Sequence, residues 1–268
     1  MMDKIDRALT EFREMDELAD QESPVHRFSV LVKLLLTILY ILVVLSFNKY
    51  DFSGLAVMVL FPLFFFQLSG IPVRKCFHKL RYILPLVMMV GILNPFFDKT
   101  AMVQIGNIRI TGGMISMVTL MMKGIFSLMA SFLLVATSGI EQICAALRKL
   151  HVPSVLTTLL LLTYRYITVL TEEVAVMNNA YHLRAPKQKG IAFEAWGSFL
   201  GQLLLRSMDR AQQIYEAMLL RGYNGEFYYA GIQKTTLREW LIGIVLACLI
   251  VFCRYYNVAA LIGSLFVR

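Results

Sequence analysis

Four apolar stretches in the first half of the chain limit what it can fold into. They cover residues 29–47, 52–69, 82–97 and 114–137. A helix needs roughly 20 residues to cross a lipid bilayer, so the second and third stretches must include flanking residues to reach that length. Hydrophobic residues make up 58% of the 268 residues and charged residues only 16%, a balance that soluble globular domains do not show. The sequence therefore predicts an all-α, polytopic membrane protein.

The N-terminal segment, residues 1–28, is acidic. Its first 22 residues hold eight Asp or Glu and three Lys or Arg, a net charge of −5 in a chain whose total is +8. A signal peptide begins with a basic region and an apolar core, so we expect none here. The excess of positive charge lies between apolar stretches and not along a stripe with exposed aromatic residues. Nucleic acid is therefore not an expected partner.

The charges of the connections predict how the helices of 29–137 are oriented. Residues 71–81 contain four Lys or Arg and no acidic residue, whereas 48–53 and 98–113 are nearly balanced. Short loops rich in Lys and Arg stay on the cytoplasmic side, so we expect the 71–81 connection and the N-terminus there. The chain then returns to the cytoplasm near residue 138.

A fifth apolar stretch, residues 153–170, continues into more polar sequence that ends at Arg184. Polar residues recur along it at helical spacing, and a central Arg165 would cost roughly 2.5 to 3.5 kcal/mol inside a bilayer. We therefore interpret 153–184 as one amphipathic helix along the cytoplasmic face, with Pro153 in its first turn. The polar stripe consists of Ser154, Thr158, Arg165, Thr168, Glu172 and Asn179.

A second amphipathic helix is predicted over 191–221, with Gly222 ending it. Both long helices thus end at an arginine, because Arg184 precedes Ala185-Pro186 and Arg221 precedes Gly222. The helix macrodipole accounts for one such cation, at about 0.3 to 1 kcal/mol. Two such arginines, 37 positions apart, have a second explanation of equal weight, which is docking onto a partner. We assign 138–236 to a cytoplasmic module that contains both helices.

The last apolar stretch, residues 237–256, predicts a final helix that runs from inside to outside. Residues 257–268 are too few to cross back. We therefore expect about five membrane spans, with 237–268 forming the last helix and a tail that is external or partly inserted.

Several stretches resemble a known family, the transmembrane T component of energy-coupling factor (ECF) transporters. "LLLRSMDRAQQIYEAMLLRGYNGEF", residues 203–227, is similar to the family's second coupling helix and its terminal signature at Leu220-Arg221-Gly222. The first signature corresponds to Leu183-Arg184-Ala185. Further similarity covers 23–38, 92–98, 137–156 and 164–174. On these residues the chain resembles the CbiQ/EcfT family in its cobalt-type branch.

The chain departs from the family's pattern at two places. Leu183 and Leu220 stand where the family usually has Ala before the signature arginine. Near the first span only Lys33-Leu34 remains of the usual Asp-Pro-Arg-x-Lys-Leu. The first departure puts in question how closely each helix end seats against a partner.

The resemblance implies a division of labour among several chains. Two cytoplasmic ABC ATPases bind ATP and Mg and hydrolyse ATP, and a membrane S component holds the substrate. The T component joins them through two coupling helices that cross like an X. The implied function is uptake of cobalt ions across a prokaryotic cell membrane. The alternative is a T component that works with vitamin-binding S components. On this basis the chain is not itself an enzyme and carries no cofactor. The residues expected to couple to the ATPases are Leu183, Arg184, Ala185, Leu220, Arg221 and Gly222.

Lys123 lies near the middle of the 114–137 stretch, where an unpaired ammonium is costly. It is a candidate intramembrane polar site that faces a partner; the alternative is a cation paired or shielded within the bundle. The cysteines and histidines lack metal-ligand spacing, and no GxxxxGK[ST] motif is present, so no metal site, catalytic site or ATPase site is predicted. A self-contained secondary transporter would need an internal repeat, and the sequence shows none. A membrane enzyme would need clustered acidic and basic residues, and the sequence shows no such cluster.

Overall fold

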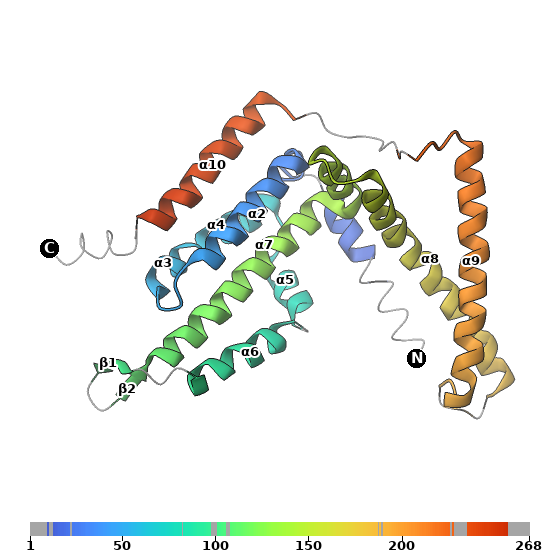
Figure 1. Ribbon diagram of the computed structural model, residues 1–268, viewed down its shortest axis with the longest axis horizontal. Helices are drawn as coiled ribbons and strands as arrows, with labels where there is room; N and C mark the ends of the chain where they lie inside the picture. Colours follow the sequence, from blue (N-terminus) through green and yellow to red (C-terminus); the bar gives the residue numbers. More distant parts are fainter. Residues whose placement is uncertain are drawn as a thin grey trace. The chain divides into compact units, whose positions relative to one another are not determined.

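The computed structural model describes residues 10, 13–21, 23–81, 83–97, 101–105, 108–186, 188, 190–225, 227 and 235–256 (Figure 1). The prediction of an all-α chain is confirmed by its helical body. The helices in the first half are α2 (Val30–Ser46), α3 (Phe52–Val57), α4 (Leu60–Ser69), α5 (Val73–Leu80), α6 (Leu84–Phe97) and α7 (Gly112–Lys149). They are followed by α8 (Ser154–Arg184), the short 3₁₀ turn η1 (Phe193–Ala195), α9 (Trp196–Leu220) and α10 (Leu237–Tyr255).

The chain divides into two compact units. One consists of Met1–Glu17 with Gly139–Ile232 and contains α8 and α9; the other consists of Leu18–Ser138 with Gln233–Arg268 and contains α2 and α10. We call them the α8–α9 unit and the α2–α10 unit. Helix α7 belongs to both, because the division falls within it between Ser138 and Gly139.

The core of the α2–α10 unit is built around α2. Tyr40 and Val44 of α2 are fully buried, together with Leu55 of α3 and, almost fully, Ile250 of α10. Helix α10 packs along α2, and the two helices approach closely at Gly243, where a Cβ atom would collide with Val32. A residue without a side chain lets two backbones come near each other, which increases their van der Waals contact.

The second apolar stretch, predicted as one span over 52–69, is divided into α3 and α4 at Met58 and Val59. Pro62 explains the division: proline has no N–H to donate to the carbonyl four residues earlier, and its ring collides with that carbonyl in a regular helix. The carbonyl in question belongs to Met58, and the buried hydroxyl of Tyr40 donates to it at 2.9 Å. The break is thus stabilised by a hydrogen bond from α2.

A short β-hairpin lies between α6 and α7, within the connection 98–113, for which no strand was predicted. Strands β1 (Ala101–Ile105) and β2 (Ile108–Thr111) pair antiparallel, with Val103 opposite Ile110 and Ile105 opposite Ile108. The signal for it was the Gly106-Asn107 dipeptide between two runs of apolar and β-branched residues, a pattern typical of hairpins. The hairpin is a local addition to the helical body.

Helix α7 extends well beyond the predicted span of 114–137. It continues to Lys149 with a kink at Gly139, whose φ of 65° and ψ of 156° are not helical. Only glycine adopts this backbone conformation readily. By length and composition α7 and α8 are each sufficient to cross a membrane. The assignment of α8 to the cytoplasmic face therefore depends on its polar stripe.

Candidate coupling-helix site

Helices α8 and α9 form a crossed pair. In Figure 1, α8 passes behind α9, and the two are joined by an ion pair between Glu173 of α8 and Arg206 of α9. Each of these residues lies about eleven positions from the connection that joins the helices, so they meet part of the way along both. The crossing agrees with the arrangement that the family resemblance implies for coupling helices.

Helix α8 ends at Arg184, as predicted. Ala185 leaves the helical conformation with φ −128° and ψ 63°, and its N–H closes the last turn on the carbonyl of Tyr181 at 3.0 Å. Pro186 favours this ending, because a proline disfavours helical conformation in the residue before it. Leu183 is 84% exposed and Arg184 is also exposed. The α8 tip therefore presents an aliphatic side chain and a cation to the surroundings.

Helix α9 starts at Trp196, later than the predicted residue 191, because residues 193–195 form η1. It ends at Leu220, with Arg221 as its cap and Gly222 in the left-handed region at φ 84°. The N–H of Gly222 donates to Leu219 at 2.9 Å and that of Tyr223 to Met218 at 3.0 Å, so the last carbonyls of the helix are satisfied. Leu220 is 90% exposed, and Arg221 is exposed beside it.

The two arginines lie at opposite ends of α9. The hydroxyl of Tyr181, near the end of α8, accepts the N–H of Ala192 at 3.2 Å and donates to Gln188 at 2.6 Å. These bonds hold the start of α9 close to the end of α8, and hence to Arg184. A helix of 25 residues, the length of α9, is about 37 Å long. Among the described residues neither Arg184 nor Arg221 has a hydrogen bond or ion pair through its guanidinium.

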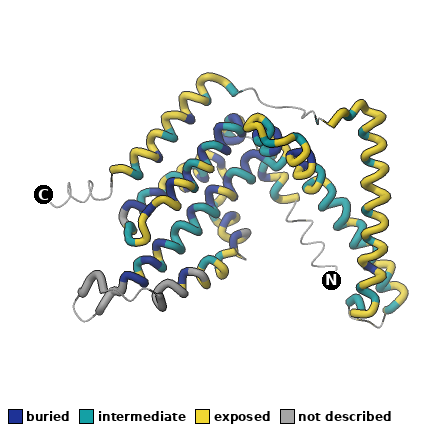
Figure 2. Tube along the Cα trace, in the orientation of Figure 1, coloured by how far each residue is buried: buried dark blue, intermediate teal, exposed yellow. Residues whose placement is uncertain are grey.

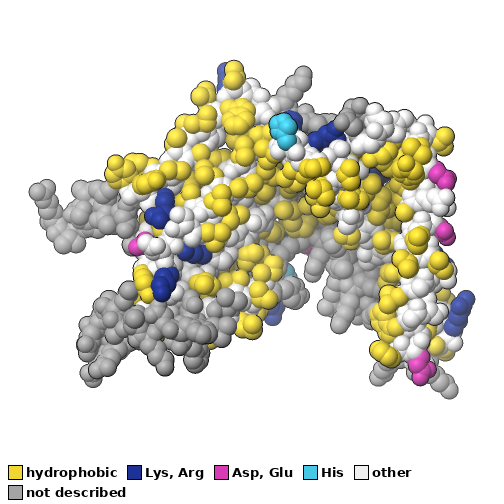
Figure 3. All heavy atoms as spheres, viewed as in Figure 1, with side chains coloured by type: hydrophobic (Ala, Val, Ile, Leu, Met, Phe, Trp, Pro, Cys, Tyr) yellow, Lys and Arg dark blue, Asp and Glu magenta, His cyan; other side chains and the backbone are white. Residues whose placement is uncertain are grey.

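An apolar groove lies between the arms of the crossed pair. It has a volume of about 450 Å³, and its walls include Leu159, Leu162 and Tyr166 of α8 and Ile214 and Met218 of α9. Figure 2 shows α9 exposed along most of its length, and Phe199 is its one buried residue. Figure 3 shows hydrophobic side chains gathered over α8 and along α9. Exposed apolar surface of this extent is typical of helices that contact lipid or a partner.

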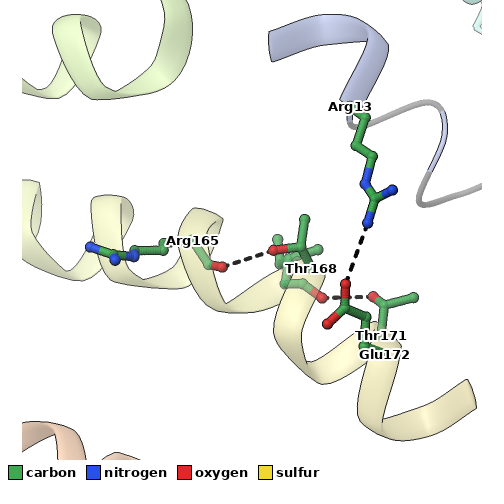
Figure 4. Close-up of polar contacts among 6 residues, drawn as sticks. Arg13, Arg165, Thr168, Thr171 and Glu172 are labelled. Carbon is green, nitrogen blue, oxygen red and sulfur yellow. Dashed lines mark hydrogen bonds and ion pairs between the residues drawn. The ribbon is translucent and has the colours of Figure 1, made fainter. Parts of the chain in front are cut away.

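The polar stripe predicted along α8 does not form one uniformly exposed face. Arg165, Glu172 and Asn179 are exposed, but Thr158 is buried. The hydroxyl of Thr168 donates to the carbonyl of Arg165 at 3.0 Å (Figure 4). Sequence reasoning missed Asn178, which is 1% exposed and whose amide has no hydrogen-bond partner among the described residues.

Lys123 donates to carbonyls at the end of α2. Its ammonium contacts the carbonyl oxygen of Leu45 at 3.2 Å and that of Phe47. Arg254 of α10 donates to the carbonyl of Ser46 at 3.0 Å and lies over the ring of Phe47. The last carbonyls of a helix have no partner within the helix and carry partial negative charge, so both cations cap α2. Among the described residues, Lys123 is thus paired with backbone carbonyls of its own chain.

Neither catalytic nor metal-binding residues were predicted. Among the described residues no group of three or more His, Cys, Asp or Glu lies close enough to hold a metal ion. Of the acidic residues on α8 and α9, Glu172, Asp209 and Glu216 are exposed, and Glu173 is half-buried and paired with Arg206.

Comparison of the sequence with known proteins assigns the chain to a family. Residues 21–229 match the family model CbiQ, described as cobalt transport protein. The chain is 27% identical over 231 residues to the energy-coupling factor transporter transmembrane protein EcfT of Thermosediminibacter oceani, which covers 81% of this chain and 84% of that protein. It is 26% identical over 198 residues to the uncharacterized protein MJ1571 of Methanocaldococcus jannaschii, covering 69% and 68% of the two chains.

A further relative has a different metal in its name. The chain is 27% identical over 122 residues to the nickel permease LarQ of Lactiplantibacillus plantarum, covering 44% of this chain and 45% of that protein. The family model covers well over half of the sequence, including both arginine-tipped helices. The chain therefore belongs to the CbiQ family of cobalt transport proteins, as a transmembrane component of an ECF-type transporter.

Proposed function

We propose that this chain is the coupling subunit of an ECF-type importer and transmits the motion of two cytoplasmic ABC ATPases to a substrate-binding S component. One observation supports this most strongly. Arg184 and Arg221 are exposed at opposite ends of the α8–α9 pair, and neither guanidinium has a partner among the described residues. Two separate cationic tips suit two separate ATPase subunits.

Arginine is suited to this role by its chemistry. Its planar guanidinium donates in a fixed fork that matches a carboxylate, and it stays charged at every physiological pH. An arginine that becomes desolvated at the centre of an interface can supply much of the binding energy. We expect each tip to insert into a groove on one ATPase and to pair with an acidic residue there. ATP and Mg then belong to the ATPases, and this chain is not catalytic.

The apolar groove between α8 and α9 supports a second contact of the crossed pair. A lining of aliphatic and aromatic side chains such as Leu159, Leu162 and Met218 suits an apolar partner surface. We propose that the S component and the bilayer surface cover these residues. Movement of the two arginine tips would then tilt the helices and, with them, the S component.

The orientation in the membrane follows from the charge distribution. We propose five spans in the cell membrane of a prokaryote, with the N-terminus and residues 138–236 in the cytoplasm. Placing α8 at the cytoplasmic face keeps Arg165 and Glu172, both exposed, out of the hydrocarbon region.

The docking proposal is tested by co-purifying this chain with its ATPases in detergent. Arg184→Glu and Arg221→Glu should each lose most of the bound ATPase, since charge reversal places a carboxylate against a carboxylate. Arg184→Lys and Arg221→Lys should show intermediate binding, because lysine keeps the charge but not the fork. Retention of both ATPases and of full transport by both Glu variants would refute the proposal.

Arg165→Glu is the matched control for these variants. Arg165 is exposed on the same helix as Arg184 and lies 19 positions before it, about 28 Å along the helix. The same reversal of charge there should leave ATPase binding unchanged.

The topology is tested by labelling introduced cysteines with a membrane-impermeant maleimide. Phe193 is 93% exposed and Glu216 is exposed, so Phe193→Cys and Glu216→Cys are suitable sites once Cys248 and Cys253 have been replaced by Ala. Labelling in inverted vesicles but not in intact cells is expected. Labelling from outside intact cells would mean that α8 crosses the membrane.

Cobalt is the substrate that the family description supports, and nickel is a second candidate because LarQ is named a nickel permease. Uptake of radioactive cobalt and nickel by cells that express this chain with its ATPases and S component separates the two. Uptake of neither metal, with intact ATPase binding, would favour a vitamin-binding S component.

A further inference from the structure

The N-terminal segment has its own contact with α8. Residues 13–19 are helical, and Arg13 forms an ion pair with Glu172 of α8 at 3.5 Å (Figure 4). Three residues further on, Asp16 accepts the hydroxyl of Tyr164 at 2.7 Å. Tyr164 and Glu172 lie eight positions apart, about 12 Å along a helix, so the short segment is attached to α8 at two separate points.

The two contacts have opposite polarity. A cation of the N-terminal segment faces an anion of α8 at Glu172, and an anion of the segment faces a hydroxyl donor at Tyr164. Burial, the hydrogen bond that the phenol donates to Asp16 and the negative charge of Asp16 all raise the pKa of Tyr164 above its ordinary value, so the phenol stays protonated and remains a donor. Exchanging the two contacts would bring Asp16 next to Glu172. The pattern therefore fixes one orientation of the segment on α8.

The C-terminal end of the segment, at Leu18, is also held by hydrogen bonding. The side chain of Leu18 is 3% exposed, and its carbonyl oxygen accepts a hydrogen bond from Nε2 of His26 at 2.9 Å. The hydroxyl of Ser23 lies 2.6 Å from Nδ1 of His26 and donates to it when the proton is on Nε2.

We propose that residues 13–16 act as a brace on α8 within the α8–α9 unit, and that movement of the Arg184 tip of α8 releases them. Both contacts with α8 are at least partly exposed, with side-chain exposures of 69% for Arg13 and 58% for Glu172. Exposed ion pairs stabilise a contact only weakly, roughly 1.5- to 5-fold in the equilibrium between bound and free states. Such a brace is strong enough to bias α8 and weak enough to be released. The regulatory role of the brace rests on the proposed coupling function, whereas the docking of the brace on α8 does not.

The docking is tested on the purified full chain in detergent by amide hydrogen exchange of residues 13–19. Arg13→Glu and Glu172→Arg should each raise the exchange rate roughly threefold or more. The double variant Arg13→Glu/Glu172→Arg restores an ion pair with reversed polarity and should return exchange to within about twofold of wild type. Arg165→Glu, which changes the charge of α8 at a side chain directed away from Arg13 in Figure 4, should have no effect.

Equal exchange in all variants, or a double variant no better than the single ones, would overturn the brace. Tyr164→Phe gives an independent check, because it removes the hydrogen bond to Asp16 and keeps the ring. It should raise exchange of the same residues without altering that of α10.

The regulatory part is tested on the assembled transporter in proteoliposomes. Arg13→Glu and Tyr164→Phe should raise ATP hydrolysis in the absence of substrate about two- to fivefold, and the charge-swapped double variant should restore the wild-type rate. Unchanged hydrolysis despite faster exchange would overturn the regulatory role and leave the docking in place. Failure of the coupling function itself appears separately, as ATPase binding that survives Arg184→Glu and Arg221→Glu.

Discussion

The ammonium of Lys33 donates to the backbone carbonyl of Thr137 at 2.9 Å, across 104 positions of sequence. Both residues are buried, and Thr137 lies two positions before the kink of α7 at Gly139. A helix that kinks loses regular hydrogen bonds on either side of the kink. Lys33 supplies a donor at this place, so α2 is tied to α7 just where the chain passes from one unit to the other.

Lys33→Met should lower the free energy of unfolding by about 1 to 3 kcal/mol, because it leaves a buried carbonyl without its charged donor. Thermal unfolding in detergent measures this. Lys75→Met, which removes the same charge from an exposed position of α5, should have little effect. Equal stability of the two variants would show that the Lys33 contact contributes nothing.

Gly139→Ala should destabilise the α7 kink. The observed φ of 65° and ψ of 156° cost a residue with a Cβ atom about 1 to 3 kcal/mol. Gly201→Ala is the control: Gly201 lies within α9, nothing surrounds its Cβ position within 4 Å, and alanine is the better helix former. We expect unfolding temperatures to fall for the first variant and to stay level or rise for the second; the opposite order would contradict the assigned kink.

Gly243→Ala should separate α10 from α2, because the new methyl group would overlap Val32. Overpacking of this kind costs about 1 to 3 kcal/mol. The double variant Val32→Ala/Gly243→Ala should recover much of the loss, and Gly197→Ala, with open space around it, should lose nothing. A double variant as unstable as Gly243→Ala would mean that the two residues do not limit the approach of the helices. Thermal unfolding distinguishes these results.

Leu183→Ala and Leu220→Ala should leave the stability of the isolated chain within about 0.5 kcal/mol, because substitutions at exposed positions rarely change it more. Their exposures are 84% and 90%. Under the proposed docking, these variants introduce the alanine that the resemblance gives as usual before each signature arginine, so ATPase binding should be equal or stronger. Co-purification with the ATPases measures the effect, and weaker binding would show that this chain's partners require leucine at the tips.

Cys76 should resist thiol reagents in the folded protein. Its side chain is fully buried in α5, and burial raises the pKa of the thiol to about 12. Because the thiolate is the reactive form, labelling near neutral pH should be very slow and should become rapid on unfolding. Mass spectrometry after treatment with N-ethylmaleimide, before and after denaturation, checks this. Rapid labelling of Cys76 in the native protein would contradict its burial.

Much of the helical framework could be predicted because its signals are local. Apolar runs marked α2, α6 and α10, and the residues Pro186 and Gly222 marked the ends at Arg184 and Arg221. The division of the second stretch at Met58 also had a local cause in Pro62, which the span prediction did not use. The β-hairpin had the same kind of unused signal in Gly106-Asn107.

The sequence by itself determined the long apolar helices α2, α6 and α10, where the two arginine-tipped helices end and how charge is distributed between the connections. Only the tertiary structure decided the partners of the charged side chains: Lys33 with Thr137, Lys123 and Arg254 with the end of α2, and Arg13 with Glu172. The physical reason is distance along the chain. A helix and its ends follow from hydrogen bonds within a few residues, whereas these cations find carbonyls and carboxylates that lie far away in sequence and come near only when the helices pack.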